Sequence, residues 1–189
     1  MSSYTTTQNI KLQSAAESKI LNAANKLFVK RGYFNVNIAK IAREAGVSKA
    51  TIYTYFQGKD DILRHLIENH FNTSARFGRS LKGKALIKDF IDRSIDSLEH
   101  HCSFLRVIYP MVFFTDSQKH LKDFLYEITM KQIKELAPAF EVIGSEHPFG
   151  DAALLVTEID GMYLHYMSVK EKYQIQVFKD SLYHRYKLG

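Results

Sequence analysis

The segment from Ser48 to Lys59 carries hydroxyl groups and amines at a spacing that could contact a phosphate backbone. Ser48 is a residue type that caps helices, so we expect a helix to begin at Lys49. On a helical wheel Ile52 and Phe56 point together toward a core, whereas the small and hydroxylated residues between them point outward. The free backbone amides of the first turn add positive potential that favours an anion. The segment therefore predicts a helix that faces a polyanion.

The outward surface of this expected helix suits close approach to DNA. It carries no carboxylate and no large aliphatic side chain. Ala50 leaves room for a nearby backbone, and Thr51 offers a hydroxyl and a methyl group to a base edge. Tyrosine hydroxyls and lysine amines can donate to phosphate oxygens. The candidate DNA-contacting residues in this segment are Ser48, Lys49, Ala50, Thr51, Tyr53, Thr54, Tyr55 and Lys59.

A second short helix is expected just before this segment. Asn37 can cap it, apolar residues recur within it at helical spacing, and Gly46 can end it. Only Gly46 and Val47 separate its end from the cap at Ser48. Two short helices joined by so tight a turn are typical of a helix-turn-helix, whose second helix enters the major groove of DNA.

Charge is distributed unevenly along the 189 residues. Residues 1–62 carry nine of the 26 Lys and Arg residues but only four of the 20 Asp and Glu residues. Most of the net charge of +6 therefore lies in the first third of the chain. A basic segment joined to a nearly neutral remainder favours a polyanionic partner for the N-terminal part.

The chain as a whole predicts helices, because apolar residues recur at intervals of three and four almost everywhere. A first helix is expected around Ile20 and ends at Gly32, and a fourth begins near Asp60 and extends to about Phe77. Further helices are expected over residues 84–101, 104–113, 116–136, 151–170 and 174–187. The predicted fold class is all-α.

The stretch LFVKRGYFNVNIAKIAREAGVSKATIYTYFQGKDDIL resembles the N-terminal region of the TetR family of bacterial transcriptional regulators. The matching residues, within 19–63, are Ile41-Ala42, Ala45-Gly46-Val47-Ser48, Tyr53, Tyr55-Phe56, Lys59 and Leu63. Two residues depart from the family pattern, which often has threonine at Val36 and glycine at Ala50. The resemblance implies that Lys49 to Tyr55 is the recognition helix, and it adds Asn37 and Arg43 as candidate DNA contacts.

The resemblance further implies a helix-turn-helix domain of three helices over residues 15–62 and a helical ligand-binding and dimerisation domain over residues 63–189. Aromatic and soft side chains concentrate in the second domain, where they could line an apolar cavity or form ordinary core. The candidate pocket residues are Phe90, Phe104, Tyr109, Phe113, Phe124, Tyr126, Tyr163 and His165.

Residues 151–167 carry apolar side chains on more than one face, so a helix there must bury both faces. In the family this helix and the last one pack against their counterparts in a two-fold dimer. The candidate dimer residues are Leu155, Ile159, Gly161, Met162, Tyr166, Phe178 and Leu182, with the glycine allowing close approach of two helices.

Other site chemistries find no support in the sequence. Residues 100–102, His-His-Cys, are adjacent, so on a helix their side chains diverge and do not converge on one metal ion. No catalytic motif and no cofactor or metal motif occurs. The single cysteine fits a reducing compartment, and the lack of a signal peptide or a long apolar run predicts a cytoplasmic protein that does not engage a membrane.

Together these features predict a homodimeric transcriptional regulator that responds to a small-molecule effector. The expected form is a repressor that leaves a palindromic double-stranded DNA operator when the effector binds, with the fourth helix coupling the two domains. Three alternatives stay open: an activator, a regulator without a ligand, and a helical enzyme or carrier whose basic N-terminus is incidental.

Overall fold

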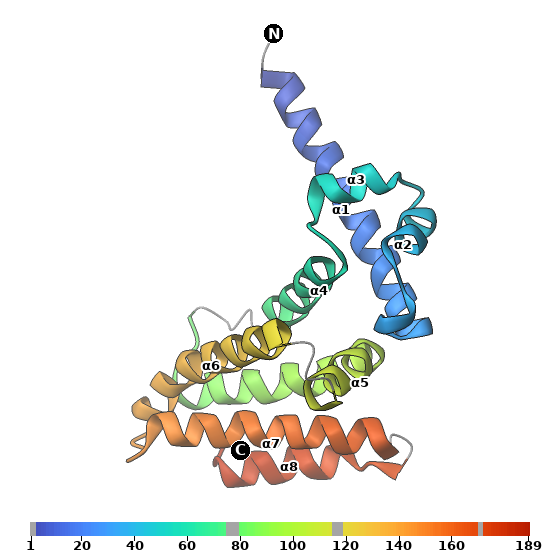
Figure 1. Cartoon of the computed structure of the whole chain (residues 1–189). Helices are drawn as coiled ribbons and strands as arrows, with labels where there is room; N and C mark the ends of the chain where they lie inside the picture. The colour runs from blue at the N-terminus through green and yellow to red at the C-terminus, as the bar shows by residue number, and fades with distance from the viewer. Residues whose placement is uncertain (1–2, 75–79, 115–118, 170–171) are drawn as a thin grey trace. The chain divides into compact units, whose positions relative to one another are not determined.

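The computed structural model describes residues 3–74, 80–114, 119–169 and 172–189, and within these ranges every regular element is a helix. Side chains are described over the same ranges except 3–14, 72–74, 101–102, 110–114 and 119–120. The elements, labelled in Figure 1, are α1 (Ser3–Arg31), η1 (Tyr33–Asn35), α2 (Ile38–Ala45), α3 (Lys49–Tyr55), α4 (Lys59–Ser74), α5 (Gly83–Phe114), α6 (Lys119–Val142), α7 (Pro148–Val169) and α8 (Ile175–Arg185). The predicted all-α fold class is confirmed.

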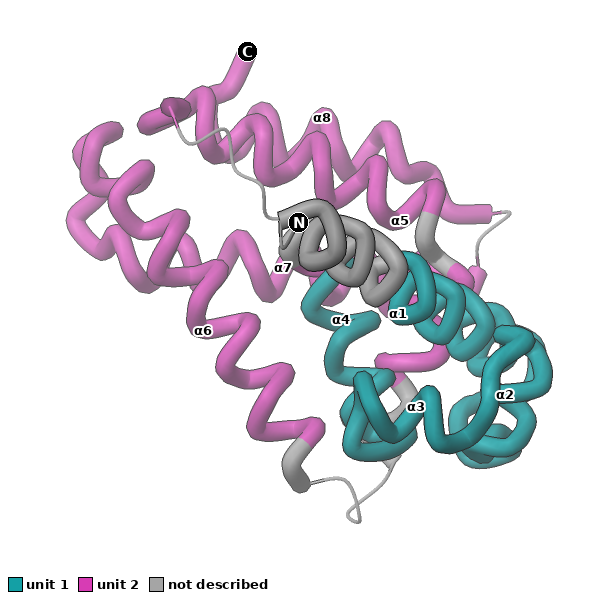
Figure 2. The backbone as a smooth tube through the Cα atoms, turned by 90° about the horizontal axis from the view of Figure 1, so that it is seen from above, with its two compact units in different colours: residues 1–70 teal, residues 71–189 magenta. Residues whose placement is uncertain are grey.

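The chain divides into two compact units, Met1–His70 and Phe71–Gly189, coloured separately in Figure 2. The division falls inside α4, a few residues beyond the boundary predicted at 62/63. Leu63 and Ile67 of α4 are both fully buried and belong to the first unit, which explains why that unit extends further along the helix.

The first unit is built around short helices whose ends are set by local residues. Helix α1 ends at Arg31 because Gly32 adopts a positive φ of 74°, a conformation in which glycine is favoured over other residues. The single 3-10 turn η1 then redirects the chain into α2. The fully buried side chains of this unit include Ile20, Phe28, Ile41, Ile52, Phe56 and Ile62.

In the second unit α5 packs on α6, α7 and α8, and α6 packs on α7. The expected pair of helices over 84–101 and 104–113 is a single helix, α5. No glycine or proline interrupts this stretch before Pro110, and Leu98, Leu105 and Ile108 continue one buried face through the expected break. Helix α6 likewise continues past Leu136 to Val142, with Pro138 inside it.

Helix α8 is held to α5 by a cluster of charges around one carboxylate. Asp92 accepts hydrogen bonds from Lys88 at 3.0 Å and from the Tyr183 hydroxyl, and it pairs with Lys179 at 2.6 Å. Partial burial would raise the pKa of Asp92, but the bonds from Lys179, Tyr183 and Lys88 overcome that effect and lower it to about 2. Asp92 is therefore ionised at neutral pH and joins the two helices.

None of the helices in the described ranges combines the length and apolarity that crossing a lipid bilayer requires.

Candidate nucleic-acid interface

The turn between α2 and α3 is defined by caps at three positions. The side chain of Asn37 accepts the backbone N–H of Lys40 at 3.0 Å and caps α2. Gly46 ends α2 with a left-handed φ of 68°. The Ser48 hydroxyl accepts the N–H of Thr51 at 2.9 Å and caps α3. All three caps were predicted from residue type, and the structure confirms them.

Helix α3 presents one buried and one open side. Ile52 and Phe56 are 0% and 2% exposed, which confirms the helical wheel. Tyr53 is 58% exposed, so its hydroxyl is available to a partner outside the domain. Tyr55, predicted to point outward, is half-buried with its ring 6.5 Å from that of Phe56. Position 55 lies only about 60° from Ile52 on the helix, which places it at the edge of the buried side.

Much of the hydrogen-bonding capacity of the α3 hydroxyls is used locally. The Thr51 hydroxyl lies 2.8 Å from that of Ser48, and the Thr54 hydroxyl donates to the carbonyl of Ala50 at 3.1 Å. Each threonine retains a methyl group and an acceptor lone pair. Thr51 and Thr54 can therefore contact a thymine methyl group or accept a hydrogen bond from a base.

The cationic side chains differ in how they are placed. Arg43 on α2 and Lys49 on α3 are exposed, and their predicted DNA contacts fit this exposure. The ammonium of Lys59 instead donates to the backbone carbonyls of Tyr33 at 3.1 Å and Val36 at 3.0 Å. Two of its three N–H donors are thus already used within the unit, contrary to its expected availability for a phosphate.

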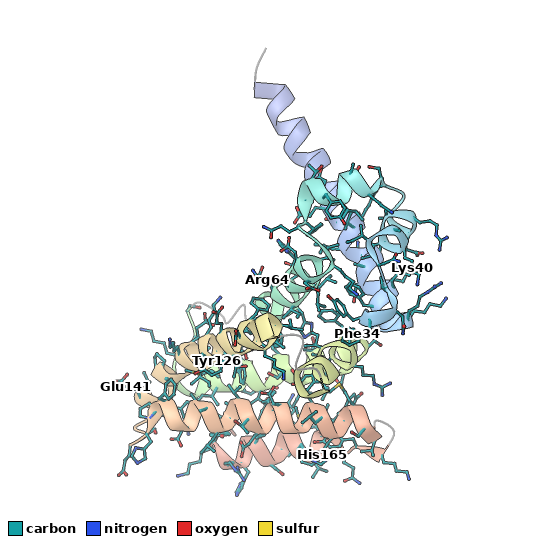
Figure 3. The ribbon with its side chains drawn as sticks, viewed as in Figure 1. Phe34, Lys40, Arg64, Tyr126, Glu141 and His165 are labelled. Carbon is teal, nitrogen blue, oxygen red and sulfur yellow. The ribbon has the colours of Figure 1, made fainter. Side chains whose placement is uncertain are left out.

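In the second unit the structure separates the predicted pocket residues into three groups. Phe90, Phe104 and Tyr163 are buried, whereas Tyr109 and Phe124 are partly buried. Tyr126 is 66% exposed on α6 and His165 is exposed on α7 (Figure 3), so the prediction that these two line an interior pocket is wrong. Their positions on the outer faces of the helices explain this. The side chain of Phe113 lies outside the described residues.

A partly buried carboxylate lies beside two of these aromatic residues, and the sequence analysis missed it. The Tyr109 hydroxyl on α5 donates to Asp160 on α7 at 2.9 Å, and the Tyr163 hydroxyl donates to the carbonyl of Ser94 at 2.8 Å. Burial raises the pKa of Asp160, and the hydrogen bond from Tyr109 only partly opposes this. Asp160 is one of three acids among the mostly apolar residues 151–167, and its position there was the available signal.

Replacing Asp160 by asparagine should stabilise the protein at neutral pH. In the folded state the pKa of Asp160 lies above its ordinary value of 3.8, so between these two pKa values the folded state binds more protons than the unfolded state. The free energy of unfolding therefore falls as the pH rises from the unfolded-state pKa to the folded-state pKa. Asparagine keeps an acceptor for Tyr109 and carries no charge. Urea unfolding should show Asp160→Asn as more stable than the wild type at pH 7.5, with the advantage shrinking toward pH 4. A difference that stays constant with pH would contradict this assignment.

Most of the predicted dimer residues belong to the core of the chain itself. Leu155, Ile159, Met162 and Tyr166 of α7 and Leu182 of α8 are buried within the second unit, so their prediction as interface residues is wrong. They lie on the face of α7 or α8 that packs against the rest of the same unit. Gly161 and Phe178 are different, because a Cβ added to Gly161 would meet no atom within 4 Å and Phe178 is 45% exposed.

The opposite face of α7 carries small residues and two leucines, and it is largely exposed. Leu154 is 61% exposed, and Thr157, Gly161, Leu164 and Ser168 follow it at helical spacing on the same side. Helix α8 exposes a corresponding face, which contains Val177, Phe178 and Ser181. These residues, and not the buried set, lie on the solvent-facing sides of α7 and α8, and we call them the α7–α8 face.

Capped short helices, a tight glycine turn and an open second helix define a protein of the helix-turn-helix class. Residues 20–66 match the family model described as "Bacterial regulatory proteins, tetR family". Residues 20–66 thus form a domain similar to the DNA-binding domain of TetR-type bacterial regulators.

Curated proteins that match part of this chain are also named as regulators. The HTH-type transcriptional regulator HbdR of Aromatoleum sp. (strain CIB) is 46% identical over 63 residues, which cover 33% of this chain and 28% of that protein. The fatty acid metabolism regulator protein of Bacillus subtilis (strain 168) is 36% identical over 72 residues, 38% of this chain and 37% of that protein. The chain thus spans well under half the length of these two relatives.

Solved structures match the fold over nearly the whole chain. The transcriptional regulator FadR from Bacillus subtilis in complex with stearoyl-CoA superposes with a TM-score of 0.72 at 20% identity, covering 89% of this chain and 96% of that one. The SmeT–triclosan complex superposes with a TM-score of 0.74 at 16% identity, covering 90% and 91%. The all-helical fold, with a helix-turn-helix followed by a helical domain, is therefore that of TetR-type regulators.

Proposed function

We propose that this protein is a homodimeric repressor that binds a palindromic DNA operator through α3 and leaves it when a small molecule binds the second unit. The proposal rests on the two different sides of α3. Ile52 and Phe56 bury one side in the first unit, and the other side exposes Lys49, Ala50 and Tyr53. An exposed helix with no carboxylate, opened by free backbone amides, suits a phosphate backbone.

The first experiment is a titration of the purified chain against the DNA upstream of its own coding region, followed by fluorescence anisotropy. Specific binding should exceed binding to a scrambled duplex by at least about 10³-fold, and it should weaken steeply as salt rises. Binding that ignores sequence would contradict operator recognition and leave the helical enzyme or carrier as the better interpretation. A reporter gene then separates repression from activation.

Replacing Thr51 by alanine should relax base preference at one operator position by about 1 kcal/mol, the lower end of the range for base contacts. The cap of α3 survives this change, because Ser48 bonds the backbone N–H of residue 51. Binding to a panel of single-base operator variants measures the effect. Lys49→Met is the matched comparison and should weaken binding to every variant about equally. Loss of discrimination in Lys49→Met but not in Thr51→Ala would reverse these roles.

The dimer is proposed to form through the α7–α8 face. Its small residues, centred on the open Gly161, allow two helices to approach closely, and its apolar members would otherwise remain in water. A two-fold dimer would present two copies of α3 to two half-sites about 34 Å apart. Light scattering coupled to size exclusion tests the dimer directly.

The effector is proposed to bind near the side chains of Tyr109, Asp160 and Tyr163 between α5 and α7, with apolar contacts from residues such as Phe104. Two of the structural relatives are complexes, one with stearoyl-CoA, whose acyl chain is apolar, and one with triclosan, and we propose a lipophilic effector here. An effector releases DNA only if it binds the DNA-incompetent state more tightly. Adding stearoyl-CoA to the protein–operator complex is the first test, with free coenzyme A as the control for the acyl chain.

A further inference from the structure

Asp160 on α7 is an acid within an apolar stripe of the helix. Ala153 and Val156 lie seven and four positions before it and Met167 lies seven positions after it, so all three share its face of α7. Val156 belongs to the buried core of the second unit, and Ala153 and Met167 are partly buried against that core. A ligand lying along this stripe would therefore contact apolar side chains and a single carboxylate.

The carboxylate of Asp160 has one donor and no basic partner in the described part of the chain. The Tyr109 hydroxyl donates to its Oδ1 at 2.9 Å. The guanidinium of Arg106, one turn before Tyr109 on α5, donates instead to the carbonyl of Met167 at 3.2 Å. Among the described residues, Oδ2 of Asp160 thus accepts no hydrogen bond and faces no counter-charge.

A carboxylate placed in this way is costly in its charged form. Burial raises the pKa of Asp160, and the bond from Tyr109 only partly opposes this effect. A ligand cation beside Oδ2 would supply the missing charge and would offset the cost of burying the carboxylate. An anion at the same place would be repelled, because like charges in a poorly solvated site destabilise each other.

The aromatic residues beside Asp160 also favour a cation. The ring of Tyr109 lies edge to face with that of Tyr163, with 6.3 Å between the ring centres. The face of a tyrosine ring attracts an ammonium group, and this attraction grows where water is excluded. The Tyr163 hydroxyl is occupied by the carbonyl of Ser94, so Asp160 supplies the negative charge of this group.

We propose that the effector site between α5 and α7 selects an amphiphile with a cationic amine head, which pairs with Asp160, and an apolar body, which lies along Ala153, Val156 and Met167. This inference rests on the proposed function, which places an effector beside Tyr109 and Asp160. It narrows the effector from lipophilic compounds in general to lipophilic amines, and it makes fatty-acid anions the poorer ligands.

Three ligands with the same ten-carbon chain test the head group: decylamine, decan-1-ol and decanoate. Calorimetric titration of the purified chain, without DNA, measures their affinities. Decylamine should bind at least about tenfold more tightly than decan-1-ol, because its bond to Asp160 is charge-assisted, and decanoate should bind most weakly. The absence of a preference for decylamine over decanoate, whether both bind or neither binds, would overturn the proposal.

Replacing Asp160 by asparagine assigns the preference to this residue. Asp160→Asn should lower decylamine affinity about tenfold and leave decan-1-ol affinity nearly unchanged. Asp123→Asn makes the same chemical change at an exposed position on α6 and should keep the wild-type preference. Urea unfolding verifies that both variants are folded. An unchanged preference in Asp160→Asn, or an equal loss in Asp123→Asn, would refute the pairing with Asp160.

Failure of this inference and failure of the proposed function give different results, because binding and DNA release are measured separately. Decylamine binding that depends on Asp160 but leaves the protein–operator complex intact would support the amine site and contradict its role as an effector site. Release of the operator by stearoyl-CoA, in a chain with no preference for decylamine, would support control by an effector and refute the amine site.

Discussion

Replacing Phe56 by alanine should lower the free energy of unfolding of the first unit by about 3 to 5 kcal/mol, the range for truncating a buried phenylalanine. Phe56 is 2% exposed, it ends α3, and its ring meets that of His65 on α4 edge-on at 5.2 Å. Because small domains are only marginally stable, a loss of this size leaves a large fraction of the unit unfolded at 37 °C. We expect operator binding to disappear with it, as measured by urea unfolding and anisotropy on the same preparation.

The matched control is Tyr53→Ala on the same helix. Tyr53 is 58% exposed, and surface substitutions of this kind change stability by about 0.5 kcal/mol or less. Tyr53→Ala should therefore unfold like the wild type while it weakens DNA binding. If both variants unfolded alike, the assignment of the buried and open sides of α3 would be wrong.

Replacing Gly161 by arginine should convert the proposed dimer into a monomer, and the folded monomer should be no less stable than that of the wild type. No atom lies within 4 Å of a Cβ at this position, and arginine favours a helix over glycine by up to about 1 kcal/mol. In a two-fold interface, however, two arginines would meet at the centre of the contact. Losing the second half-site contact should lower operator affinity by about 10² to 10⁴-fold. Light scattering and anisotropy measure the two effects.

Ser103→Arg on α5 is the control for the added charge, since Ser103 is exposed on a helix outside the α7–α8 face. It should remain dimeric and bind the operator as the wild type does. A Gly161→Arg variant that stays dimeric would exclude the α7–α8 face as the interface, and the dimer would then have to form through another surface.

The helix-turn-helix was accessible from sequence because its signals are local. Asn37 and Ser48 cap helices through bonds to residues three positions on, and Gly32 and Gly46 end helices through their own φ angles. The period of apolar residues then orients α3 and places Ile52 and Phe56 inside. None of these steps needs knowledge of a distant part of the chain.

The second unit was predicted less completely, because apolar periodicity does not say what covers each face. Helix α7 has apolar side chains on two sides, and the sequence analysis assigned Leu155, Ile159 and Met162 to a dimer. The structure uses these residues for the core of the unit and leaves Leu154 and Leu164 open. The prediction that Tyr126 and His165 line a pocket was wrong for the same reason. Both side chains lie on exposed faces of their helices.

The sequence by itself determined the helical class, the ends of the short helices and the family of the first unit, because these depend on residue type and on spacing within a few positions. Only the tertiary structure decided that Lys59 bonds to η1, that Asp160 is partly buried beside Tyr109, and that the open face of α7 is the one centred on Gly161. The first two facts depend on contacts between residues that are 23 or more positions apart, and the third depends on which face of α7 the rest of the unit covers, so a one-dimensional pattern does not contain them.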